Sequence, residues 1–275
     1  MMAKAISGSR KPALARKTTA PVSNGVGTGT VQRVIALLSQ IASTRDQIGV
    51  AELSGRLDLP MPTTHRLLHL LREEGMVDWN ASSKRYSIGP ELFRISALVS
   101  AGADLPRIAQ REIDQVAELT GEATLFGVYL PNAAGMSFIA RAEGRHALQY
   151  RIELNAVMSL VWGASGRAIL AYLPDDVVAA ALARTEANAS GAPRPDAEKL
   201  DQDLARIRRN GYAVSEGEKL QGARGVAAPV FNQSGITGSI CVTSPSERIP
   251  IDSVTELAEI VREAAGRISR SLGAS

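Results

Sequence analysis

The sequence lacks the features of a disulfide-stabilised or membrane-embedded protein. Its one cysteine, Cys241, cannot form an internal disulfide, so nothing in the composition asks for an oxidising compartment. No segment approaches the roughly 18 uncharged apolar residues that a membrane span requires. Aromatic residues make up only 4% of the chain, but 45% of it is hydrophobic, which is enough for a buried core. We therefore expect a soluble, globular, cytoplasmic protein with no membrane partner.

The beginning of the chain lacks the continuous apolar core of a secretory signal. Residues 1–27 are instead rich in Lys, Arg, Ser, Thr and Ala, a composition that transit peptides share. We interpret residues 1–27 as a disordered basic arm, in which Lys11, Arg16 and Lys17 are available to DNA phosphates.

Positive charge is concentrated at the amino-terminal end of a chain whose length favours two domains. Residues 1–90 hold 12 Lys and Arg against 6 Asp and Glu, whereas residues 91–275 hold 19 against 22. A basic end is expected for a protein with a polyanionic partner, although a positive surface also serves solubility alone. The order of the predicted elements decides between these interpretations.

The basic end has the pattern of a helix-turn-helix. Apolar residues three and four positions apart predict helices over 31–41 and 50–57, and a third over 62–74. Pro60 and Pro62 predict a tight turn before the third helix, because proline ends one helix and is tolerated in the first turn of the next. The apolar face of the third helix is predicted to bury Leu67, Leu68, Leu70 and Leu71. Its polar start would read DNA.

A wing follows this unit. Residues 76–79 and 85–88 predict two strands joined by a polar turn, with basic side chains near the tip. The residues that we expect on double-stranded operator DNA are Thr63, Thr64, His65, Arg66, His69, Arg72, Lys84 and Arg85. A metal site at His65 and His69 is the alternative, but no third ligand lies nearby in the sequence, so no metal is predicted.

This region resembles the IclR-type transcriptional regulators. The residues that carry the resemblance are Leu59-Pro60-x-x-Thr63-x-His65-Arg66-Leu67-Leu68, then Gly75, then Tyr86-x-Ile88-Gly89. The family usually has Lys-Ser where this chain has Met61-Pro62, and Val at Thr64. One phosphate-seeking cation is therefore missing, and the operator sequence cannot be transferred from the family.

The remainder of the chain predicts an α+β domain with a mainly antiparallel sheet flanked by helices. Strands come in consecutive groups, which argues against a doubly wound nucleotide-binding fold. The expected helices cover 90–101, 104–120, 164–172, 175–187, 196–209 and 251–272. The expected strands cover 124–130, 136–140, 211–215, 225–231 and 236–243.

Residues 162–171, 211–216 and 222–230 extend the resemblance to this second domain. It implies a GAF-like effector domain and homodimers that can pair into tetramers. The resulting organisation is a winged helix-turn-helix over 28–90, a linker helix over 91–103, and an effector-binding and oligomerisation domain over 104–275.

The resemblance also places contacts to a small effector. Carried over by position, they are Met158, Ala164, Ser165, Ser215, Ala223, Gly225, Cys241 and Thr243. The run Ala164-Ser165-Gly166 opens a predicted helix, and free backbone N–H groups there suit the carboxylate of an organic acid. Tight helix packing would equally explain these small residues.

Two other functions remain as alternatives. In the first, the second domain only oligomerises and the DNA-binding regulator needs no ligand. In the second, the chain is an enzyme that uses Cys241 or His146, but Cys241 lies in an apolar strand and His146 has no orienting partner in the sequence. We expect no catalytic residue and no cofactor. The sequence does not distinguish a repressor from an activator.

Overall fold

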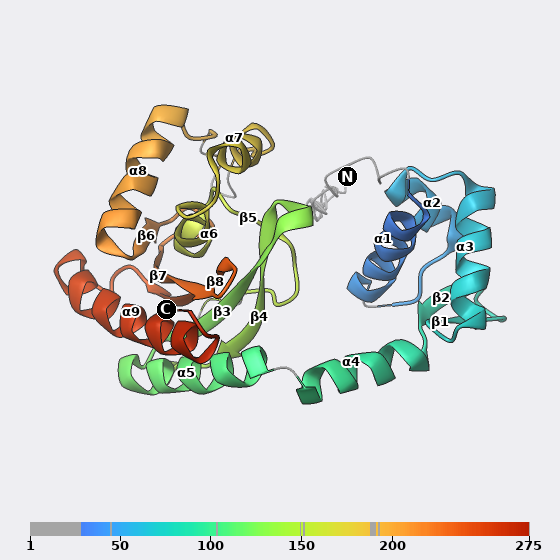
Figure 1. The fold of residues 1–275 in the computed structure, drawn as a ribbon, viewed down its shortest axis with the longest axis horizontal. Coiled ribbons are helices and arrows are strands. Elements are labelled where there is room, and N and C mark those ends of the chain that lie inside the picture. Colours follow the sequence, from blue (N-terminus) through green and yellow to red (C-terminus); the bar gives the residue numbers. More distant parts are fainter. Residues whose placement is uncertain are drawn as a thin grey trace, which may run out of the picture. The chain divides into compact units, whose positions relative to one another are not determined.

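The computed structural model describes residues 29–44, 46–102, 104–148, 150, 152–187, 191 and 193–274. The predicted basic arm over 1–27 lies outside them. The chain divides into two compact units between Ser96 and Ala97, inside helix α4 (Pro90–Gly102) (Figure 1). This division falls within the segment predicted as a linker. Among the described residues, no helix is long and apolar enough to cross a membrane.

Among its described residues, the first unit contains three complete helices and a two-stranded hairpin before α4 begins. These elements are α1 (Thr30–Ser43), α2 (Val50–Leu57), α3 (Met61–Glu73), β1 (Val77–Asn80) and β2 (Arg85–Ile88). The strands pair in the register Val77 to Ile88, and Ile48 forms a further bridge to Tyr86. The winged helix-turn-helix predicted from the sequence is therefore confirmed.

The core of this unit is formed by the three helices, the segments beside them and the hairpin, and most of its side chains are aliphatic. Its fully buried members include Leu37, Ile48, Leu53, Leu67 and Leu68. The prediction that Leu70 is buried is wrong, because its side chain is 46% exposed. The apolar stripe of α3 is narrower than four leucines suggest, since Leu67, Leu68 and Leu71 already fill the face that meets the other helices.

The second unit is built on one six-stranded sheet in the order β5-β4-β3-β8-β7-β6. Its strands are β3 (Ala123–Leu130), β4 (Gly135–Ala142), β5 (Met158–Ser159), β6 (Ala213–Glu216), β7 (Ala223–Asn232) and β8 (Gly235–Pro245). Each described pair of neighbours is antiparallel. The predicted α+β fold class is confirmed, and the two-residue strand β5 is too short to produce a detectable alternation.

Helices cover both faces of this sheet (Figure 1). Helices α5 (Asp104–Thr120) and α9 (Val254–Ser271) pack on one face, and α6 (Gly163–Leu170), α7 (Asp175–Ala183) and α8 (Ala197–Asn210) lie on the other. Alternate residues of a strand therefore enter different cores, as Val242 packs with α9 and Cys241 packs with α6. Two short 3₁₀ turns, Pro131–Ala133 and Ile251–Ser253, complete the unit.

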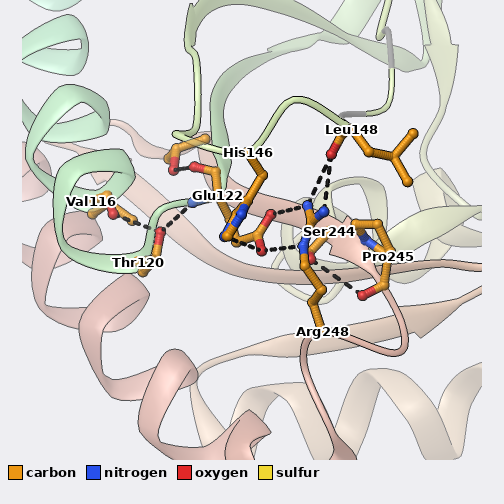
Figure 2. A network of polar contacts seen from close by, with 9 residues as sticks. Val116, Thr120, Glu122, His146, Leu148, Ser244, Pro245 and Arg248 are labelled. Carbon is orange, nitrogen blue, oxygen red and sulfur yellow. Dashed lines mark hydrogen bonds and ion pairs between the residues drawn. The ribbon is translucent and has the colours of Figure 1, made fainter.

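A buried carboxylate fixes the loop that follows β4 (Figure 2). Both oxygens of Glu122 accept hydrogen bonds from the Arg248 guanidinium, at 2.8 and 2.7 Å. His146 Nε2 lies 3.7 Å from the same carboxylate, and Arg248 also donates to the carbonyl oxygen of Leu148. This network joins the start of β3 to the segments after β4 and after β8.

Substitution of Gly166 tests whether close packing explains the small residues at the start of α6. A Cβ atom at this position would lie 2.6 Å from the carbonyl oxygen of Leu160, which is backbone and cannot rotate away. We expect Gly166→Ala to lower the free energy of unfolding by about 1–3 kcal/mol in urea titrations. Gly266→Ala in α9 is the control, since its nearest atom is the mobile end of Arg270. Equal stability of both variants would contradict the packing role.

Candidate DNA-binding surface and effector site

The turn between α2 and α3 fixes the orientation of α3. Asp58 ends α2 in the left-handed conformation, with φ of 51°. The amide of Leu59 donates to the Ser54 carbonyl at 3.1 Å, and the Ser54 hydroxyl donates to the Leu59 carbonyl at 2.6 Å. Pro60 then occupies the N-cap of α3. A short, internally bonded turn of this kind holds two helices at a set angle, as a helix-turn-helix requires.

The outer face of α3 carries most of the predicted DNA-contacting residues. His65, Arg66, His69 and Arg72 are exposed, and Thr63 is half-buried. Three of these residues lie on one helical face, because His65, His69 and Arg72 follow one another at spacings of four and three. The surface that results is polar and basic.

The prediction that Thr64 faces DNA is corrected by the structure. Thr64 is fully buried, and its hydroxyl donates to the carbonyl oxygen of Pro60 at 3.3 Å. This backbone bond satisfies the hydroxyl inside the core, so threonine is tolerated where the helical stripe continues from Leu67 and Leu68.

The two basic residues predicted near the tip of the wing differ in their contacts. Lys84 is exposed in the turn, where φ is +53°. Arg85, in contrast, donates through Nη1 to the carbonyl oxygen of Gln47 at 2.6 Å, and Ser83 bonds the Gln47 side chain at 2.6 Å. Lys84 is therefore available to a phosphate, whereas Arg85 also braces the wing against the segment before α2.

In the second unit, the predicted effector residues gather on the α6 side of the sheet. Strand alternation places Ser215, Ala223, Gly225, Cys241 and Thr243 on the same face of β6, β7 and β8. Gly225 lies opposite Thr243, and Ala227 lies opposite Cys241. Ala164 packs in the same core, and Met158 of β5 packs against it.

Gly225 lies where three other predicted effector residues meet. A Cβ atom there would lie 3.0 Å from Ser215 Oγ, 3.4 Å from Ala164 Cβ and 3.8 Å from Cys241 Sγ. The amide of Ala164 donates to Ser215 Oγ at 2.9 Å. Ser165 is buried, and its carbonyl oxygen accepts a hydrogen bond from Ser239 at 3.2 Å. The first turn of α6 is thus joined to the sheet at this cluster.

Two charged residues that were not predicted as site residues, Arg167 and Glu218, form an ion pair beside the start of α6. Glu218 Oε2 accepts from the amide of Gly163 at 2.8 Å, and Glu218 Oε1 accepts from Arg167 Nη2 at 2.5 Å. Arg167 is itself buried and donates from Nε to the Val161 carbonyl. A carboxylate at a helix N-terminus is stabilised by the helix dipole and the free amides.

The neighbouring Lys219 and Cys241 also lie at this site. Burial lowers the pKa of Lys219 to about 8, against the opposing effects of Cys241 and Glu218. Burial raises the pKa of the Cys241 thiol, although hydrogen bonds with Ser165 and Thr243 and the charge of Lys219 act in the other direction. Cys241 is therefore a neutral thiol at physiological pH.

Comparison with known families matches both units. The model of the bacterial transcriptional regulator IclR C-terminal domain matches residues 97–270, and that of the IclR helix-turn-helix domain matches residues 30–81. The chain belongs to the IclR family. This membership confirms the resemblance found in the sequence and makes the chain a transcriptional regulator with a DNA-binding helix-turn-helix.

Relatives of known name match this IclR-family chain over almost its full length. The transcriptional repressor IclR of Escherichia coli strain K12 is 27% identical over 266 residues, which cover 96% of this chain and 95% of the repressor. The crystal structure of an IclR-type regulator from a Silicibacter species has 26% identity and a TM-score of 0.82, and the match covers 90% of this chain and 97% of that one.

A third relative was crystallised with a ligand. This IclR homolog from Microbacterium hydrocarbonoxydans was solved in complex with 4-hydroxybenzoate. It has 22% identity and a TM-score of 0.70, and the match covers 88% of this chain and 98% of that one. The fold is therefore shared with a protein that holds an aromatic acid.

The state of Cys241 can be measured directly. Because the thiol is buried and its pKa is raised, we expect a thiol-specific disulfide reagent at pH 8 to react slowly with the folded protein. In denaturant one equivalent should react at once, since the chain has one cysteine. Cys241→Ser is the blank. Rapid reaction of the folded protein would indicate an activated thiol and favour the enzymatic alternative.

Proposed function

We propose that the chain regulates transcription by binding an operator, and that a small organic acid bound in the second unit changes the affinity of the protein for this operator. The observation that carries this proposal is the cluster of small and hydroxyl-bearing residues where Ala164 meets Ser215 and Gly225. Small side chains let a ligand approach the backbone closely, and the hydroxyl groups beside them suit the oxygens of a carboxylate.

The DNA-binding part of the proposal rests on α3 and the wing. Two copies would place their α3 helices in successive major grooves of a near-palindromic operator, about 34 Å apart. His65, Arg66 and His69 would approach base edges, whereas Arg72 and Lys84 would contact phosphates. Thr63 is half-buried at the start of α3 and would take part only at the edge of this surface.

The effector part of the proposal rests on the α6 side of the sheet. A ligand changes DNA affinity only by binding one arrangement of the regulator better than another. The solved relative with 4-hydroxybenzoate supports an acid of this size as the class of ligand. The alternative is a second unit that serves only to join copies of the chain.

Arg66 provides the test of the DNA-binding surface. We expect Arg66→Ala to weaken binding to an operator, selected by the wild-type protein from random DNA, by about 10- to 100-fold, because a bidentate base contact is lost. Arg209→Ala, an exposed arginine of α8, removes the same charge elsewhere and should leave affinity unchanged. Thr64→Ser should also bind normally. Normal binding by Arg66→Ala would show that another residue reads the operator.

Effector control is tested by thermal melting with a library of metabolic carboxylates, followed by operator binding with each hit. A ligand present at 100 times its Kd should stabilise the protein by about 2.7 kcal/mol. We expect at least one acid to raise the melting temperature and to change operator affinity. An acid that raises only the melting temperature, or a library without hits, would favour the regulator that needs no ligand.

A further inference from the structure

Lys219 carries a buried positive charge that the protein does not neutralise. Its stem is partly exposed, but Nζ is buried and hydrogen-bonded to no atom of the residues that the structure describes. An isolated buried ammonium is costly, because it has lost its water and gained no partner. An anionic ligand would supply the missing partner.

The side chain lies directly over the first turn of α6. A Cβ atom at Gly163 would be 3.0 Å from both Cδ and Cε of Lys219. The charged and titratable groups that act on the ammonium are Arg167 of α6, Glu218 next to it in sequence, and Cys241 of β8. Nζ therefore belongs to the same cluster as the proposed effector residues.

The carboxylate that acts on Lys219, that of Glu218, is already paired. Glu218 accepts from the Gly163 amide with one oxygen and from Arg167 with the other. Arg167 pairs with Glu218, and Asp203, which lies 3.8 Å from Arg167, pairs with Arg206 of the same helix. With these pairs balanced and Cys241 neutral, one positive charge, that of Lys219, is left over at the site.

We propose that Lys219 is the counter-ion of the effector, and that the effector is a small organic acid with a single carboxylate, which accepts a hydrogen bond from Nζ. This inference rests on the proposed function, and it adds the charge of the ligand and the residue that selects it. A second carboxylate on the ligand would meet Glu218 without a further cation, so dicarboxylates should bind less well.

The pH dependence has a definite sign. The pKa of Lys219 is lowered to about 8 by burial, and a bound carboxylate would raise it. The ammonium is therefore present below pH 8 in the free protein, and ligand binding requires proton uptake above it. Affinity should fall about tenfold per pH unit above that pKa.

The experiment compares acids with their neutral amides on the full-length protein. The probes are benzoate and benzamide, 4-hydroxybenzoate and its amide, and propionate and propionamide, followed by melting and calorimetry. The variants are Lys219→Met and Lys219→Arg, with Lys199→Met as control because Lys199 is an exposed lysine of the same unit.

The expected result is that an acid, but not its amide, shifts the melting of the wild-type protein. Lys219→Met should bind that acid roughly 10- to 100-fold more weakly, Lys219→Arg should keep part of the affinity, and Lys199→Met should match wild type. Free Lys219→Met should melt at a higher temperature than free wild type. The loss of affinity of the wild-type protein above pH 8 checks the same claim without any variant.

Two outcomes overturn the inference and differ in what else they overturn. If an acid binds Lys219→Met as tightly as wild type, or if amides bind as well as acids, the counter-ion role is wrong and effector control stands. If no acid binds the wild-type protein, effector control by organic acids fails and the role of Lys219 fails with it.

Discussion

The proposed effector site depends on the pairing of β7 with β8. These strands form the longest ladder of the sheet, from Ala223 opposite Pro245 to Asn232 opposite Gly235. Because side chains alternate between faces, a slip of one residue would move Cys241 and Thr243 from the α6 side to the α9 side. On the other side of β8, Gly238 allows a close approach to β3, since a Cβ atom there would lie against the carbonyl oxygen of Gly127.

The elements of the first unit could be predicted from the sequence because the patterns that define them span only a few neighbouring residues. The predicted helix over 50–57 matches α2, and the prolines correctly predicted the start of α3 within one residue. The errors concern which face of α3 is buried. Thr64 lies three and four positions before Leu67 and Leu68, so helical periodicity places it inwards, and its bond to Pro60 satisfies its hydroxyl there. The polar character of Thr64 led to the wrong prediction that it is exposed, whereas helical periodicity alone would have predicted its burial.

The second unit was harder to predict because its proposed effector site joins segments that are distant in the sequence. Alternation could place Gly225, Cys241 and Thr243 on one face, once the strands were located. No periodicity applies to the connection between β6 and β7, which turns through the positive φ values of Gly217 and Gly222. The positions of Glu218 and Lys219 depend on those turns, so the sequence did not predict that one would cap α6 while the other stays unpaired.

Among the described residues, Glu218 is paired and its neighbour Lys219 is not, and this difference limits where the proposed ligand can bind. Breaking a buried ion pair such as that of Arg167 and Glu218, whose side chains are 10% and 18% exposed, costs about 3–5 kcal/mol. Arg167 also lies 3.8 Å from Asp203 of α8, so the pair belongs to a network that joins α6 to a second helix. An acid that competed for the α6 amides would have to meet this cost, whereas one that pairs with Lys219 gains a charge partner and leaves the existing pair in place. Under the proposal that Lys219 is the counter-ion, the unpaired lysine, rather than the helix terminus, sets the charge of the effector.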